Sequence, residues 1–142
     1  MEIETRSGLS AFGDQNTVIL TTYRRDGSEV DTPVHIAVEG DHAFIRTYAR
    51  TWKARRLRAD PRAVVWPATI GRMNAMLATM RQKDAKRAGA GVSARARILS
   101  GREYKHAARV LRHRFPLAHG LIIPLTHRLW RTQTINVELT AG

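Results

Sequence analysis

The stretch AFIRTYARTWKARR, residues 43–56, decides the fold of this chain together with VDTPVHIAV, residues 30–38, which stands before it. Apolar and polar residues alternate in 30–38 and a β-rich run opens 43–56, which predicts two strands joined by a tight turn. The second strand leads to Thr51 and then to a helix rich in arginine and lysine. The first turn of a helix has unpaired N–H groups and the positive end of its dipole, so this junction is suited to hold a phosphate.

The order of the remaining elements predicts a small antiparallel barrel with helices at its openings. The Asp26-Gly27 pair predicts a hairpin. Pro33 places its strand at a sheet edge or makes it bulge locally, because proline cannot donate to a ladder. The class expected is mainly β (α+β), with six strands and two or three helices. The expected strands are 17–23, 30–38, 42–48, 63–66, 92–99 and 132–140, and the expected helices are 51–60, 72–87 and 101–115.

Two connecting segments are less regular. Residues 72–87 have helical propensity, with Met73, Met76, Leu77 and Met80 on one stripe expected to pack. The glycine-rich exit that follows leaves open a mobile loop that orders over a ligand. Residues 117–130 are expected to form an apolar connector.

Composition limits the function classes. At 142 residues the chain is expected to form a single domain, 1–142, and the absence of cysteine excludes disulfides and thiolate chemistry. The N-terminus has no signal-like apolar region, and no apolar run reaches the roughly 20 residues that a bilayer requires, so a cytoplasmic protein without membrane contact is expected. The net charge of +12 attracts polyanions, although arginine richness also follows from genome composition.

The candidate site is the start of the cationic helix. Thr51 is predicted to cap the helix, Lys53 lies in its first turn, and Arg56 lies one turn further on the same face. Arg50 precedes the cap. Cations at this end oppose the helix dipole by several tenths of a kcal/mol each, and such a local conflict favours a function over a solvated charged face.

Three motifs resemble the flavin- and deazaflavin-binding split β-barrels, the pyridoxamine-phosphate-oxidase-like superfamily. They are Pro33-Val34-His35-Ile36 on the second strand, Thr47 followed by Thr51-Trp52-Lys53, and the Leu-x-x-Asp-Pro-Arg pattern at residues 57–62. The resemblance covers residues 17–67 by motif and residues 92–140 by architecture only. It implies a six-stranded split β-barrel.

The resemblance also implies the site residues, because proteins of this superfamily bind FMN, the deazaflavin coenzyme F420 or haem. Thr51 and Lys53 would hold the cofactor phosphate, with Arg50 and Arg56 in support. The other expected contacts are Arg46, Thr47 and Trp52 at the ring, Val34 and His35 behind it, and Pro67, Ala68 and Thr69 along its rim or its tail.

The function implied is hydride transfer between F420 and a small unsaturated organic substrate, in a homodimer whose cofactor cleft lies between the subunits. The cofactor supplies the chemistry in such enzymes, so no catalytic side chain is named. The positive charge suits the acidic tail of F420. FMN in the same pocket remains an alternative. A basic nucleic-acid-binding module is a second alternative, against which the scarcity of aromatic residues argues. A barrel that stores a cofactor without turnover is a third.

Other chemistries lack their motifs. The six histidines are dispersed without metal-ligand spacing, so no metal site is expected. Hydrolase and nucleotide-loop motifs are absent. Residues 73–86 replace the shorter loop that the resemblance implies, so this segment either covers the pocket or takes its place.

Overall fold

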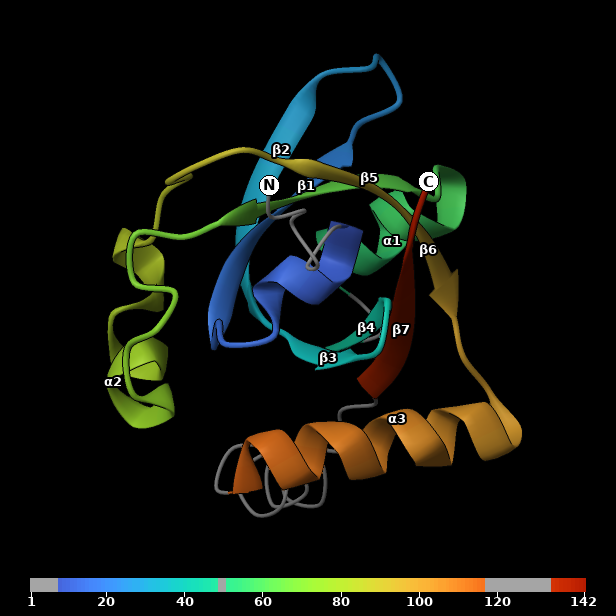
Figure 1. Ribbon diagram of the computed structural model, residues 1–142. Helices are drawn as coiled ribbons and strands as arrows, with labels where there is room; N and C mark the ends of the chain where they lie inside the picture. The colour runs from blue at the N-terminus through green and yellow to red at the C-terminus, as the bar shows by residue number, and fades with distance from the viewer. Residues whose placement is uncertain (1–7, 49–50, 117–133) are drawn as a thin grey trace, which may run out of the picture.

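The computed structural model describes residues 8–48, 51–116 and 134–142 (Figure 1). Seven strands form one antiparallel sheet in the order β2-β1-β5-β6-β7-β4-β3. The strands are β1 (Thr17–Tyr23), β2 (Glu29–His35), β3 (Ala37–Glu39), β4 (His42–Tyr48), β5 (Arg62–Pro67), β6 (Val92–Ile98) and β7 (Thr134–Ala141). The helices are α1 (Trp52–Ala59), α2 (Ala75–Met80) and α3 (Gly101–Arg114), with short 3-10 turns η1 (Gly8–Phe12) and η2 (Gln82–Asp84).

The two edges of the sheet are successive segments of the chain. β2 and β3 are separated only by Ile36, yet they occupy opposite ends of the strand order. The sheet therefore curls round on itself, and η1 lies inside the curl (Figure 1). Leu9 and Phe12 of η1 are buried in this interior. Sequence patterning did not predict η1, because a five-residue turn has no resolvable period.

The strand count is seven, where six were expected. The segment 30–38 is divided at Ile36, whose N–H bonds the carbonyl of Asn16 instead of continuing the ladder. The residues on either side pair with different strands, β1 and β4. Apolar alternation continues across the bend, so the pattern alone cannot show it. Pro33 lies on edge strand β2, which confirms its predicted place.

Two apolar clusters hold the elements together. The first fills the curl, and Leu57 of α1 packs into it; Ala54 of α1 is buried as well. The second lies between α3 and the outer face of β3 and β4, where Phe44 meets Leu111 and Phe115. α3 thus crosses the outside of the sheet and α1 closes one opening (Figure 1). The helices expected at 51–60 and 101–115 are confirmed.

The segment 72–87 differs from its expected helix. Only six residues form α2, and the chain then continues through η2 to an antiparallel bridge between Arg87 and Ala68. The expected packing stripe is wrong, because Leu77 and Met80 are 50% and 69% exposed. The connector expected at 117–130 lies outside the described residues. No helix within the described ranges combines the length and hydropathy that crossing a membrane requires.

Candidate anion site at the start of α1

Thr51 joins the end of β4 to the start of α1. Its hydroxyl oxygen accepts a hydrogen bond from the N–H of Ala54 at 3.1 Å, which confirms Thr51 as the helix cap. The same hydroxyl lies 3.2 Å from the hydroxyl of Thr47 at the end of β4. The structure therefore brings together the two threonines that the motif singles out. Arg50 lies outside the described residues.

Two cations of α1, Lys53 and Arg56, are partly buried. Lys53 is half-buried, and burial, followed by the positive charge of Arg56, lowers the pKa of its amine to about 8. The Nε of Arg56 donates to the Thr22 hydroxyl at 2.7 Å. Burial, followed by the charge of Arg24, also lowers the pKa of Arg56.

Within the ranges that the structure describes, no acidic side chain forms an ion pair with Lys53 or Arg56. Two partly dehydrated cations without an acid are a local excess of positive charge. An anion beside Lys53, Arg56 and the Thr51 hydroxyl would relieve this excess. This corner is the candidate site.

Trp52 is 71% exposed at the first position of α1, and the guanidinium of Arg55 lies 4.9 Å from the centre of its ring. The aromatic surface is therefore available to a planar ligand or a partner chain beside the corner.

Arg46 and Thr47 leave β4 on opposite faces, as neighbours on a strand must. The half-buried Arg46 donates through Nε to the Oδ1 of Asn136 at 3.0 Å, on the face that α3 covers, and burial lowers its pKa. Asn136 is fully buried on β7 and donates to the backbone carbonyl of Tyr104 at 3.0 Å. The sequence patterning did not single out Asn136, although an amide between the apolar Ile135 and Val137 was a signal for it.

Val34 and His35 also lie on opposite faces. Val34 is buried in the cluster that fills the curl. The His35 ring stacks on Phe115, with ring centres 4.7 Å apart, and its Nε2 lies 3.2 Å from the Thr79 hydroxyl of α2. Burial lowers the pKa of His35. Their contacts are therefore with the barrel core, with α2 and with the end of α3.

Pro67, Ala68 and Thr69 lie beside the chain that follows α2 and pair with it through the backbone. The N–H of Thr69 bonds the carbonyl of Lys86, and the carbonyl of Pro67 accepts from the N–H of Ala88. The segment 73–86 thus leads to a strap, residues 86–88, across these three residues. The sequence left open whether the segment 73–86 would cover the expected site. In the structure, the strap that follows this segment lies along the outer face of β1, β2 and β5.

Arg87 fastens this strap. Its guanidinium bonds Asp31 at 2.7 Å and Glu29 at 2.9 Å, and it lies 4.2 Å from the centre of a Trp66 ring. The Thr21 hydroxyl accepts from Arg87 and from Trp66 and donates to Asp31 at 2.6 Å.

A glycine is needed at Gly91, because a Cβ there would lie within 2.9 Å of Trp66.

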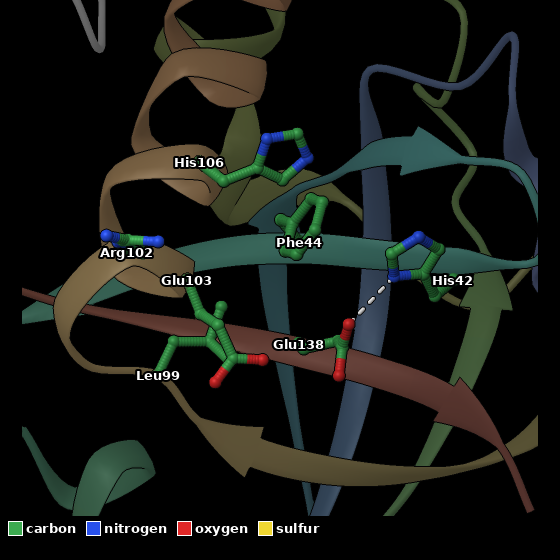
Figure 2. A pocket seen from close by; sticks show the side chains of 7 residues that line it. All are labelled: His42, Phe44, Leu99, Arg102, Glu103, His106 and Glu138. Atoms are coloured by element: carbon green, nitrogen blue, oxygen red, sulfur yellow. Dashed lines mark hydrogen bonds and ion pairs between the residues drawn. The ribbon is translucent and has the colours of Figure 1, made fainter.

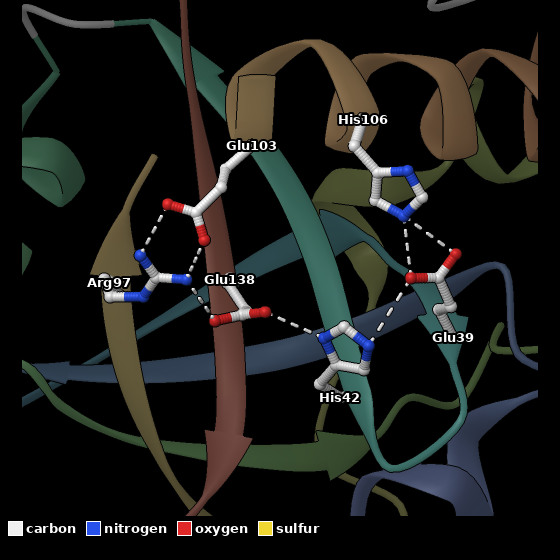
Figure 3. A network of polar contacts seen from close by, with 6 residues as sticks. All are labelled: Glu39, His42, Arg97, Glu103, His106 and Glu138. Carbon is white, nitrogen blue, oxygen red and sulfur yellow. Dashed lines mark hydrogen bonds and ion pairs between the residues drawn. The ribbon is translucent and has the colours of Figure 1, made fainter. Parts of the chain in front are cut away.

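A shallow hollow of about 270 Å³ lies between α3 and the outer face of β4 and β7 (Figure 2). Its walls carry a chain of polar contacts, running His106–Glu39–His42–Glu138–Arg97–Glu103 (Figure 3). Burial disfavours the charge of Glu138, but hydrogen bonds from His42 and Arg97 hold its pKa below the usual value.

These groups bind one another, so we interpret the network as structural: it holds α3 against the sheet. No group of three or more possible metal ligands occurs in the described chain. A second hollow of about 280 Å³ lies beside η1 and the end of β7. Neither hollow includes a residue of the α1 corner.

Comparisons with known proteins place the fold. No protein-family model matches the chain, and no curated protein does. Among solved structures, a protein of unknown function from Agrobacterium tumefaciens is 24% identical over 92% of this chain, with a TM-score of 0.67; the chain spans 50% of its length. The haem storage protein HutZ of Vibrio cholerae is 14% identical over 94% of this chain and 87% of its own, with a TM-score of 0.67.

An F420-H2 dependent reductase, FDR-A, is 14% identical over 87% of this chain and 93% of its own, with a TM-score of 0.54. The fold is therefore that of the pyridoxamine-phosphate-oxidase-like split β-barrels. The resemblance stated from the motifs is confirmed at the level of the fold. Structures with this fold include proteins named for haem and for F420, so the fold alone leaves the cofactor open.

Proposed function

We propose that this protein is an F420-dependent oxidoreductase that transfers a hydride to a small unsaturated organic substrate. The observation that carries the proposal is the corner of Thr51, Lys53 and Arg56, where two partly dehydrated cations have no acidic partner among the described residues. A cofactor phosphate supplies the missing charge. The fold similarity to an F420-H2 dependent reductase supports the choice of cofactor.

The bound deazaflavin would supply the hydride. The chain's own residues bind and orient it: Thr51 and Lys53 hold the phosphate, and Arg56 adds positive charge while Thr22 fixes its guanidinium. The exposed ring of Trp52 offers a flat apolar surface beside the phosphate. Because neither hollow of the described chain includes a residue of this corner, we propose that a second copy completes the cleft in a homodimer.

A side-by-side titration of the apo protein with F420, FMN and haemin tests the cofactor. Tight binding of F420, together with reduction of a quinone or enone by F420H2, is the expected result. Preferential binding of FMN would favour the flavin alternative in the same pocket. Preferential binding of haemin, or F420 binding without turnover of any acceptor, would contradict the oxidoreductase assignment.

The titration is repeated with Lys53→Ala and with Lys83→Ala, whose side chain is exposed in η2. Both substitutions remove one positive charge, so the control isolates the position of the charge from its amount. Equal loss of affinity in the two variants would show that the bulk field attracts the ligand and would remove the corner from the proposal.

A further inference from the structure

One side of α3 carries a line of four cations, Arg102, Lys105, Arg109 and Arg112, of which Arg102 also borders the hollow between α3 and the sheet. They follow one another at intervals of three or four residues, so their side chains leave the same side of the helix. All four are exposed, whereas Ala107 and Leu111 on the other side are fully buried. At 1.5 Å per residue the line is about 15 Å long. We call it the α3 cation line.

Acidic residues do not neutralise this line. The one acid of α3, Glu103, bonds Arg97 of β6 through both of its oxygens, at 3.0 and 2.6 Å. Other acids are paired elsewhere, Asp14 with Arg72 and Asp60 with Arg62. In the described part of the chain, no ion pair involves a member of the α3 cation line.

The arrangement is unfavourable for an isolated helix, because like charges three and four residues apart repel. A local cost of this kind is typical of residues kept for binding. α3 tolerates the repulsion because its other side is held on the sheet by the cluster around Phe44, Leu111 and Phe115 and by the His106–Glu39 contact. The cations are therefore presented on a rigid, prealigned surface.

We propose that the α3 cation line binds the sugar–phosphate backbone of a nucleic acid. Arginine guanidinium groups match phosphate geometry, and a row of them follows a charged polymer better than a single anion. No large apolar side chain of α3 is exposed; those exposed in the described chain are Trp52, Leu77 and Met80. A helix that docks on a membrane inserts apolar side chains, so the α3 surface favours nucleic acid over lipid.

The scarcity of aromatic residues, noted in the sequence, argues against stacking on bases and not against contacts with phosphates. Recognition is therefore independent of base sequence, with DNA and RNA bound through the same chemistry. This function lies outside the proposed oxidoreductase activity and uses a different surface from the α1 corner.

Lysine footprinting tests the surface in the unmodified protein. The chain has only four lysines: Lys105 lies in the α3 cation line, Lys53 in the α1 corner, Lys83 in η2 and Lys86 shortly after η2. We expect a 20-base-pair duplex to slow acetylation of Lys105 at least threefold, while Lys83 and Lys86 react as before. A duplex that binds without protecting Lys105 would overturn the proposal. FMN or F420 alone should protect Lys53 instead, so the two proposals fail separately.

Salt dependence tests the four cations together. The variant R102Q/K105Q/R109Q/R112Q is compared with R25Q/K83Q/K86Q/R95Q, which removes four exposed cations from other elements, so both have a net charge of 12 − 4 = +8. Four phosphate contacts contribute about −3.6 to the slope of log K against log salt for duplex DNA. In the α3 variant, we expect the slope of log K against log salt to become shallower by roughly this amount. In the control variant, we expect the slope to stay close to that of the wild type.

Equal losses in the two variants, or no duplex binding by the wild type at low salt, would refute the proposal. So would binding to phosphatidylserine vesicles through the same four cations at a salt concentration where duplex does not bind. When the acetylation footprint is repeated with a single-stranded RNA in place of the duplex, Lys105 should be protected to the same degree. Circular dichroism checks that the α3 variant folds; where it does not, the footprint of the wild type decides.

Discussion

The hydroxyl groups of Thr47 and Thr51 lie 3.2 Å apart, which ties the end of β4 to the cap of α1. The Thr51 oxygen also accepts from the N–H of Ala54, so one side chain holds the strand, the helix and the candidate anion site in register. Stability and ligand affinity are therefore coupled at this position.

Replacement of Thr51 tests that coupling. Thr51→Ala removes the cap and should lower the free energy of unfolding by about 1 kcal/mol, the usual value for such caps. Thr51→Ser keeps the hydroxyl and should retain most of the stability and the cofactor affinity. Urea unfolding and ligand titration of the two variants give both quantities. A Ser variant as weak as the Ala variant would show that the methyl group, and not the hydroxyl, matters.

Lys53 is expected to contribute directly to cofactor binding. Lys53→Ala should weaken the affinity for F420 or FMN by about 1.5–3 kcal/mol, the range for a hydrogen bond to a charged group. Isothermal titration calorimetry measures the change against wild type and Lys83→Ala. Unchanged affinity in Lys53→Ala would remove the residue from the site.

The pKa of Lys53 makes binding depend on pH. It is lowered to about 8 by burial and by Arg56, whereas a lysine in an unfolded chain titrates near 10.4. Between these values the unfolded chain holds a proton that the folded chain has lost, so the Lys53 contribution to stability rises with pH through this window.

Anion binding has the opposite sign, because the anion prefers protonated Lys53. Affinity should fall up to tenfold per pH unit above about pH 8, with proton uptake on binding. The second ionisation of a phosphate monoester lies near pH 6, below this range, and it would raise the affinity with pH instead of lowering it. Titrations at pH 7, 8 and 9 should show the fall in wild type and a flat profile in Lys53→Gln; parallel profiles would contradict the assignment.

Asn136 is expected to be a major determinant of stability. Its side chain bonds Arg46 and the carbonyl of Tyr104 in a fully buried position. Asn136→Ala leaves these partners unsatisfied and should cost about 2–3 kcal/mol. Thr140→Ala, at an exposed position of the same strand, should change the free energy of unfolding by less than about 0.5 kcal/mol. Chemical denaturation compares the two, and similar losses would refute the role of Asn136.

Arg87 should control the strap that crosses Pro67–Thr69. Arg87→Ala removes two partly exposed ion pairs and the contact with Trp66, for a total of about 1–2 kcal/mol. Hydrogen exchange should quicken at the amides of Thr69 and Ala88, which bond across the strap. Arg95→Ala, at an exposed position of β6, is the control. Unaltered exchange in Arg87→Ala would mean that the backbone bonds alone hold the strap.

Local chemistry was enough to predict several elements. β1 occupies the predicted 17–23, because β-branched residues and the following Asp26-Gly27 turn specify a strand and a hairpin within a few residues. The Thr51 cap and the burial of Leu57 follow from helix-end chemistry and from a 3.6-residue period. The split-barrel resemblance rested on motifs of the same short range.

Tertiary structure decided what depends on distant partners. Residues 30–38 alternate without interruption, yet they divide at Ile36 because the two halves pair with strands that are far apart in the chain. The segment 72–87 has helical propensity, but α2 ends at Met80, and Arg87 pairs with Asp31 and Glu29 of the distant strand β2. Asn136 meets Arg46, and Lys53 is partly dehydrated without an acid, only once β4, β7 and α1 are assembled. Sequence therefore determined the local conformations, whereas pairing energies between remote segments determined the closure of the barrel and the charge of its corner.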